Sequence, residues 1–230
     1  SEMCIRDRAH GELGVGLALA RLGRGAAARE ITDRALRRAE TLPVAPWWEH
    51  GHAGRALVFA ELAHLLDLPD AAAAAQAHTE ACLTVLDHAV RASRIGAADQ
   101  PTPGGTPEDT DAGDHVDIQL PGDLEDLETA LGHAPGLLRG WAGVALALLR
   151  LADLHPGEPG RRLAAAAVRA IRLDARHTSF VHGALTARHG PRLLPYLGVG
   201  AAAIGLAAHC ALERQDHWAT AQPTPDRTPE

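Results

Sequence analysis

The sequence predicts an all-α protein built from repeated helix pairs. Glycine turns recur immediately before stretches rich in alanine and leucine, which is typical of helices buried on every side. The glycines of these turns are Gly11 and Gly14, Gly51 and Gly54, Gly140 and Gly143, and, less regularly, Gly200 and Gly205. Gly11 and Gly51 lie 40 residues apart, the length of one helix-turn-helix repeat. Aromatic residues make up only 3% of the chain, so the core must consist mainly of Ala, Leu and Val, which suits closely packed helices.

Composition limits the possible functions. A chain of 230 residues with 46% hydrophobic residues can form one sizeable core. The formal net charge is -7, with 29 acidic and 22 basic residues, so no nucleic-acid partner is expected. Three cysteines are too few for a disulfide framework and indicate a cytoplasmic protein. The longest weakly polar run, 196–212, contains Gly and His and is barely long enough to span a bilayer, so no membrane partner is expected.

The N-terminal half is predicted to hold two helix pairs. Residues 1–8, SEMCIRDR, resemble a translated adaptor sequence and are expected to be a non-native leader. Helix pairs are then expected over 9–94. The first pair ends with an amphipathic helix over 26–40. The second consists of an apolar helix over 55–68 and an outer helix over 71–94.

The C-terminal half begins with a break in this pattern. Residues 95–126 are rich in Gly, Pro and Asp and are expected to form a flexible insertion, because they cannot bury enough apolar surface to offset ordering. Residues 127–213 are expected to form two further pairs, with an outer helix over 161–175 and a last helix within 195–212. Residues 214–230 are expected to be a polar tail.

The glycine turns also resemble those of a known family. Gly140-Trp141-Ala142-Gly143, Pro195-Tyr196-Leu197 and the run from Val199 to Gly205 are similar to motifs of the lanthionine synthetase C-like cyclase domain. The resemblance covers residues 9–213 and is closest to the C-terminal cyclase region of class III lanthipeptide synthetases. It implies an α/α toroid of seven helix pairs. With about four pairs, this chain would be a fragment, an arc of that toroid.

The resemblance implies a role in lanthipeptide biosynthesis. The family adds cysteine thiols of a ribosomally made precursor peptide to dehydrated Ser or Thr residues, which gives thioether rings. The implied partners are this peptide and the kinase and lyase domains of the same synthetase. The alternative is a noncatalytic helical scaffold that binds the leader peptide or the neighbouring kinase domain. An α/α-barrel glycosidase is disfavoured, because Glu12 is the only acid inside a glycine turn.

No cofactor and no bound metal are expected for this chain. In the zinc-dependent members of the family, one turn supplies a cysteine ligand and another supplies Cys-His. This chain has Leu138 at the first position and Gly198 and Val199 at the second, and none of these side chains binds zinc. Cys210 with His209 lies about ten residues into the last helix, away from the turn.

His50 and His10 are the candidate catalytic residues, because each stands at the mouth of a glycine turn. A neutral imidazole there could remove the thiol proton near neutral pH, as the resemblance implies for His50. The alternative is that both cap helix starts. The other histidines show no convincing metal-ligand spacing, and His182 and His189 are expected to lie in loops before Pro195.

Overall fold

The structure is a computed structural model in which most of the described residues are helical, as the sequence predicts. It describes residues 11–38, 45–49, 51–98, 124–181, 184–189 and 192–220. One layer of helices consists of α1 (Glu12–Arg21), α3 (His52–Leu66), α6 (Trp141–Leu154) and α8 (Ala201–Thr220). A second layer consists of α2 (Gly25–Arg38), α4 (Pro69–Ala98) and α7 (Glu158–Ala175). The short helix α5 (Leu124–Ala130) precedes α6.

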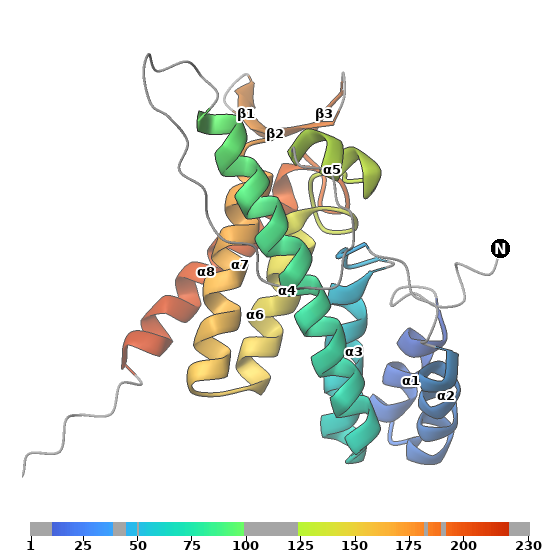
Figure 1. Cartoon of the computed structure of the whole chain (residues 1–230). Coiled ribbons are helices and arrows are strands. Elements are labelled where there is room, and N and C mark those ends of the chain that lie inside the picture. Colours follow the sequence, from blue (N-terminus) through green and yellow to red (C-terminus); the bar gives the residue numbers. More distant parts are fainter. Residues whose placement is uncertain are drawn as a thin grey trace, which may run out of the picture.

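The two layers follow the chain in order. Each helix of the first layer packs against the next one, from α1 through α3 and α6 to α8, and these are called the inner helices below. Each of α2, α4 and α7 packs against the inner helix that precedes it, and α4 also contacts both α2 and α7. The pair α1 and α2 lies at one end of this row, and α8 lies at the other (Figure 1).

The helix boundaries follow the glycine turns closely. Helices α1, α3 and α6 begin two residues before Gly14, Gly54 and Gly143, and α8 begins directly after Gly200. Two helices are longer than the sequence indicates: α4 continues to Ala98, and α8 continues to Thr220. Of the expected insertion over 95–126, the two ends are helical, and residues 99–123 lie outside the described part of the chain.

A small antiparallel sheet was not predicted. Its strands are β1 (Thr178–Val181), β2 (Ala184–His189) and β3 (Arg192–Leu194), in the order β1-β2-β3. Phe180 faces Leu185 across the first pair, and Ala187 is buried in the hydrophobic core, where β2 packs on α8. The expectation that His189 lies in a loop is therefore wrong, because it ends β2. His182 lies outside the described residues.

The core is formed mainly by α3 and α6, which are buried on most sides, as their apolar sequences predict. Its largest fully buried side chains include Trp141, Phe59, Leu57 and Leu148. Cys82 is also fully buried, which agrees with its interpretation as a small core residue, and burial raises the pKa of its thiol to about 12.

Three of the inner helices begin from the same kind of turn. In each turn a proline stands five residues before a glycine, and an alanine stands two residues after that glycine. These residues are Pro46, Gly51 and Ala53; Pro135, Gly140 and Ala142; and Pro195, Gly200 and Ala202. The carbonyl of Pro46 accepts a hydrogen bond from Ala53 N at 3.1 Å, and that of Pro195 accepts one from Ala202 N at 3.3 Å. We call this segment the Pro-Gly turn.

Two glycines in the first turns of α3 and α6 allow the chain to pass very close beneath the helix. A Cβ atom at Gly54 would lie less than 3.0 Å from the carbonyl oxygen of Trp48, and one at Gly143 less than 3.0 Å from that of Leu137. Both obstacles are backbone atoms, so they cannot rotate away. The Gly143 amide donates a hydrogen bond to Gly136 O at 3.2 Å, which holds the segment in place.

Ion pairs connect all four inner helices farther along their length. The Glu61 carboxylate of α3 contacts Arg21 of α1, and it lies 3.5 Å from Arg150 of α6. Asp153 of α6 lies 3.8 Å from Arg150 and 2.7 Å from Arg214 of α8. The charges alternate in sign along this chain of contacts, which favours the observed order of the helices.

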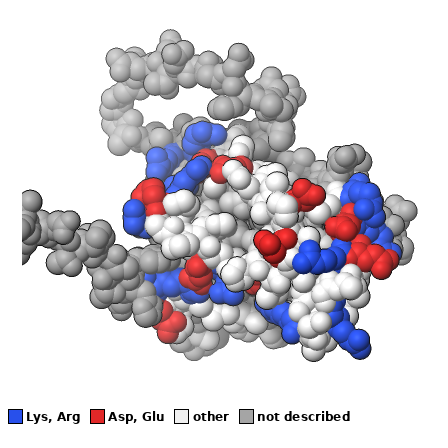
Figure 2. Space-filling model, turned by 90° about the horizontal axis from the view of Figure 1, so that it is seen from below, with Lys and Arg blue, Asp and Glu red and all other residues white. Residues whose placement is uncertain are grey.

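The surface carries charges of both signs. The face in Figure 2 shows acidic and basic side chains next to one another between uncharged ones. Within the described ranges, no helix has both the length and the apolar character that a transmembrane span needs.

The close approach at Gly143 predicts a large effect of one methyl group. Gly143→Ala should lower the free energy of unfolding by about 3 kcal/mol or more, because the Leu137 carbonyl has no room to move. Gly205→Ala is the matched control, because Gly205 is helical and exposed and no atom of the described residues lies within 4 Å of its Cβ position. This variant should raise the free energy of unfolding by up to about 1 kcal/mol. Urea denaturation of both variants measures the difference. Equal stabilities would contradict the packing described here.

Candidate functional site

Neighbouring Pro-Gly turns are hydrogen-bonded to one another at equivalent positions. The amide of Glu49 donates to Leu138 O at 3.0 Å, and the amide of Leu138 donates to Gly198 O at 3.0 Å. Each of these residues is the third after the proline of its own turn. We call these three residues the turn ladder. The ladder places three successive turns side by side and in register.

The ladder brings together two of the positions that the family resemblance singles out. A Cβ atom at Gly198 would lie 3.3 Å from the Leu138 side chain, so these two positions are in contact. Val199 follows directly and is half-buried. The next residue of the α6 turn, Arg139, is exposed and pairs with Glu49, with Nε 3.1 Å from Oε2. Neither Leu138 nor Gly198 offers a metal-binding side chain.

The predicted catalytic histidines, His10 and His50, lie outside the described residues. Their neighbours in the chain are described: Glu49 belongs to the ladder, and Gly51 is the N-cap of α3. Cys210 is half-buried in the middle of α8, and the adjacent His209 is exposed and lies 3.3 Å from Glu213.

A buried carboxylate that the sequence analysis missed holds the turn before α6. Asp174, in the last turn of α7, is fully buried. Its Oδ2 accepts hydrogen bonds from Ala142 N at 2.8 Å and from Gly136 N at 3.1 Å. The N-cap of α6 is Gly140, which has no side chain to receive these amides. Asp174 therefore caps α6 from another helix. In the other two turns, the carbonyl of the turn's own proline accepts the equivalent amide.

Asp174 also belongs to a cluster with Glu128, His133 and His177, which we call the Glu-His-Asp cluster. Asp174 Oδ1 lies 2.8 Å from His133 Nε2. Glu128 Oε2 lies 3.1 Å from His177 Nε2 and 3.7 Å from His133 Nδ1. The other oxygen of Glu128 accepts a hydrogen bond from Trp141 Nε1 at 3.0 Å. Four polar side chains thus meet beside the turn that enters α6.

The charges within this cluster stabilise one another. Burial opposes ionisation of Glu128, but His177, His133 and the Trp141 N–H together lower the pKa of its carboxyl below the usual value. The contact with the Glu128 carboxylate raises the pKa of His177, despite the opposing effect of burial.

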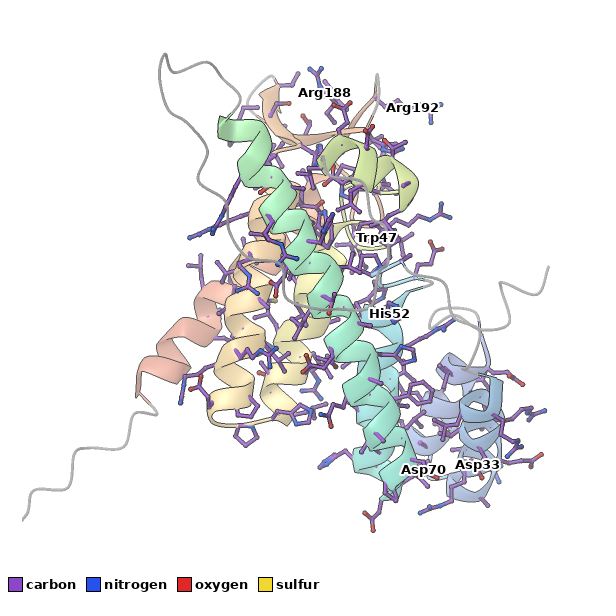
Figure 3. All side chains as sticks on the ribbon, viewed as in Figure 1. Asp33, Trp47, His52, Asp70, Arg188 and Arg192 are labelled. Atoms are coloured by element: carbon purple, nitrogen blue, oxygen red, sulfur yellow. The ribbon has the colours of Figure 1, made fainter. Side chains whose placement is uncertain are left out.

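Trp47 connects the cluster to the preceding repeat. Its ring lies 5.4 Å from that of His133 and 5.0 Å from that of Trp141, measured between centroids. Its Nε1 donates a hydrogen bond to Leu131 O at 2.7 Å. Figure 3 shows Trp47 above His52, which begins α3.

A second pair of histidines lies between α3 and α4. Nδ1 of His52 and Nδ1 of His78 are 2.9 Å apart, so one ring donates a hydrogen bond and the other accepts it. Phe59 stacks on His78, with 5.9 Å between the ring centroids. Burial, together with the charge of Arg55, lowers the pKa of both histidines to about 4.

The sequence contains little that would reveal these histidine contacts. The cluster residues come from α5, the following loop and the end of α7, and they meet only because α6 and α7 fold back on each other. The one local signal is the spacing of Asp174 and His177, three residues apart at a helix end. The spacing of the histidines in the sequence did not indicate that His133 and His177 meet beside Glu128.

No protein-family model, curated protein or solved structure matches this chain. The resemblance to the cyclase family is therefore based on the sequence motifs alone.

Removal of the Asp174 carboxylate should be costly. Asp174→Ala leaves the buried amides of Gly136 and Ala142 without their acceptor, and we expect a loss of about 3–5 kcal/mol in the free energy of unfolding. Asp87 is a matched control, because it forms an exposed ion pair with Arg169, and Asp87→Ala should cost less than about 1 kcal/mol. Chemical denaturation of both variants measures the two losses in the free energy of unfolding. Similar small losses would show that Asp174 is not the cap of α6.

The His52–His78 pair predicts acid sensitivity. Both pKa values are lower in the folded protein, about 4, than the ordinary 6.5, so the unfolded chain binds more protons between these values. Stability should therefore fall as the pH drops from about 6.5 to 4. His78→Gln should make this slope smaller, whereas His64→Gln, at an exposed position of α3, should not change it. Melting temperatures across this pH range provide the measurement, and an unchanged slope in His78→Gln would contradict the assignment.

Proposed function

We propose that this chain is part of a cyclase-like domain that forms thioether rings in a lanthipeptide precursor. The turn ladder is the observation that carries the proposal. The same main-chain contact joins one turn to the next at equivalent positions, from Glu49 to Leu138 and from Leu138 to Gly198. A closed ring of helix pairs requires a relation that repeats in this way.

The ends of the helix row are consistent with an arc of a toroid. Val15 and Leu22, in and after α1, are 52% and 76% exposed, and Leu206 and Leu212 of α8 are 41% and 62% exposed. In the proposed toroid, further helix pairs would cover these apolar side chains, as each repeat covers its neighbour within the row.

The proposed reaction is the addition of a peptide thiol to a dehydrated residue. The thiol loses its proton, and the sulfur forms a bond to the β-carbon of dehydroalanine or dehydrobutyrine. The electron pair of the carbon–carbon double bond moves toward the carbonyl, and the α-carbon then takes a proton. Because Leu138 and Gly198 offer no metal ligand, we assign both proton transfers to a positioned base, with His50 the first candidate and His10 the second.

A noncatalytic scaffold is the second candidate, and the sheet favours it. Strands β1 and β3 form the two edges of the sheet, and an extended peptide can add to such an edge. Phe180 of β1 is 78% exposed, and Tyr196, just after β3, is 67% exposed. Arg188 and Arg192 extend from the sheet (Figure 3), which suits an acidic peptide segment.

The test uses a synthetic peptide that contains one cysteine and one dehydroalanine. We expect the purified chain to accelerate ring closure over buffer alone and to give a single diastereomer. His50→Asn should lower the rate by roughly 100-fold or more, since a positioned base contributes about that much. Thiol alkylation followed by mass spectrometry measures the remaining open peptide, and the melting temperature should stay unchanged.

His189→Asn is the control, because His189 is exposed at the end of β2, and it should cyclise at the rate of the unchanged protein. Peptide binding without acceleration, measured by fluorescence anisotropy, would reject the cyclase and favour the scaffold. Full activity in His50→Asn would instead remove His50 from the mechanism.

A further inference from the structure

We propose that Glu128, His133 and His177 form a binding site for zinc or a similar first-row divalent cation, with Asp174 as the supporting carboxylate. One potential ligand atom from each of the three residues lies within 4.8 Å of the other two. None of these residues is Leu138, Gly198 or Val199, the positions where the resemblance would place ligands. The proposal is therefore independent of the cyclase function.

Two of the three distances between the potential ligand atoms are close to those around a tetrahedral ion, and the third is at most 4.8 Å. Bonds of about 2.0–2.1 Å to nitrogen and oxygen place neighbouring tetrahedral ligands about 3.4 Å apart. Glu128 Oε2 lies 3.1 Å from His177 Nε2 and 3.7 Å from His133 Nδ1, on either side of this value. Rotation of the side chains would bring the three ligand atoms to these distances.

The surrounding contacts hold two of the three ligands in the required orientation. His133 Nε2 faces Asp174 Oδ1 at 2.8 Å, which leaves Nδ1 on the side of Glu128. Metal-binding histidines usually donate their second ring N–H to a carboxylate in this manner. Trp141 Nε1 holds Oε1 of Glu128 at 3.0 Å and leaves Oε2 for the ion.

His177 supplies both an unused nitrogen and a path from solvent. Its Nε2 is buried and has no hydrogen-bond partner among the described residues, although Glu128 Oε2 is only 3.1 Å away. Both atoms can therefore serve as ligands of one ion. The His177 side chain is 30% exposed, whereas those of His133 and Glu128 are 5% and 8% exposed.

The donor set selects the class of ion. Two imidazoles and one carboxylate suit zinc and neighbouring transition metals, whereas calcium and magnesium prefer oxygen ligands. Three protein ligands leave a fourth position for water on the His177 side. Because Asp174 also caps α6 and holds Gly136, a bound ion would stabilise the turn that carries the ladder.

The expectation of a metal-free domain was based on the glycine turns, on Cys210 and on the spacing of the histidines in the sequence, which does not reveal this cluster. The cluster lies elsewhere, so it requires its own experiment. After dialysis against a chelator, zinc is added to the chain and measured by calorimetry and elemental analysis. We expect one zinc per chain and a higher melting temperature with zinc. Cobalt in place of zinc should give the visible absorption of a tetrahedral site.

His177→Gln removes one ligand at a partly exposed position, so folding should survive. We expect zinc affinity to fall by about 100-fold or more and the melting-temperature shift to disappear. Glu128→Gln should behave likewise, and His189→Gln should bind as the unchanged chain does. Absence of binding would overturn the proposal. So would zinc binding that persists in His177→Gln, or that is lost in His78→Gln or Cys210→Ala, because the ion would then occupy another place.

Discussion

The structure depends on the close passage of the chain beneath the first turns of α3 and α6. At Gly54 and Gly143 the preceding backbone occupies the space where a side chain would begin. This contact fixes the direction in which each helix leaves its turn. It also fixes the loop that precedes the helix, because that loop is held between the helix and the next turn. The ladder among Glu49, Leu138 and Gly198 then joins these two turns to the turn before α8.

Charged groups act in two different ways in this fold. The exposed ion pairs between α4 and α7, such as Asp87 with Arg169, lie in high dielectric and contribute little stability. Asp174 is different, because it is fully buried and accepts two main-chain hydrogen bonds in addition to its histidine contact. The α6 turn therefore depends on a side chain from the end of α7. The other two Pro-Gly turns are capped within their own sequence.

The sequence predicted the features that are encoded locally. Paired glycines followed by apolar runs located α1, α3 and α6 to within two residues, because both signals belong to adjacent positions. The sheet was missed because its strands have three to six residues and only a few buried positions. The sequence did not reveal the Pro-Gly turn, because the four residues between its proline and its glycine have little in common among the three copies.

The sequence likewise predicted one part of the candidate sites and missed another. Leu138 and Gly198 were singled out through the resemblance, and they lie in contact across the ladder. The Glu-His-Asp cluster depends on the packing of α6 against α7, which no spacing in the sequence reveals. The roles of His50 and His10 stay predictions, because both residues lie outside the described part of the chain.

The ladder also affects how such a domain can evolve. Its hydrogen bonds use only main-chain atoms, so the contact is the same whether a glutamate, a leucine or a glycine occupies the position. Substitutions at these positions can therefore add or remove a reactive group while the frame around it persists. In this fold, the chemistry of the turn and the hydrogen bonds that hold the helix row in register are separable properties, and a single mutation can change the first while the second persists.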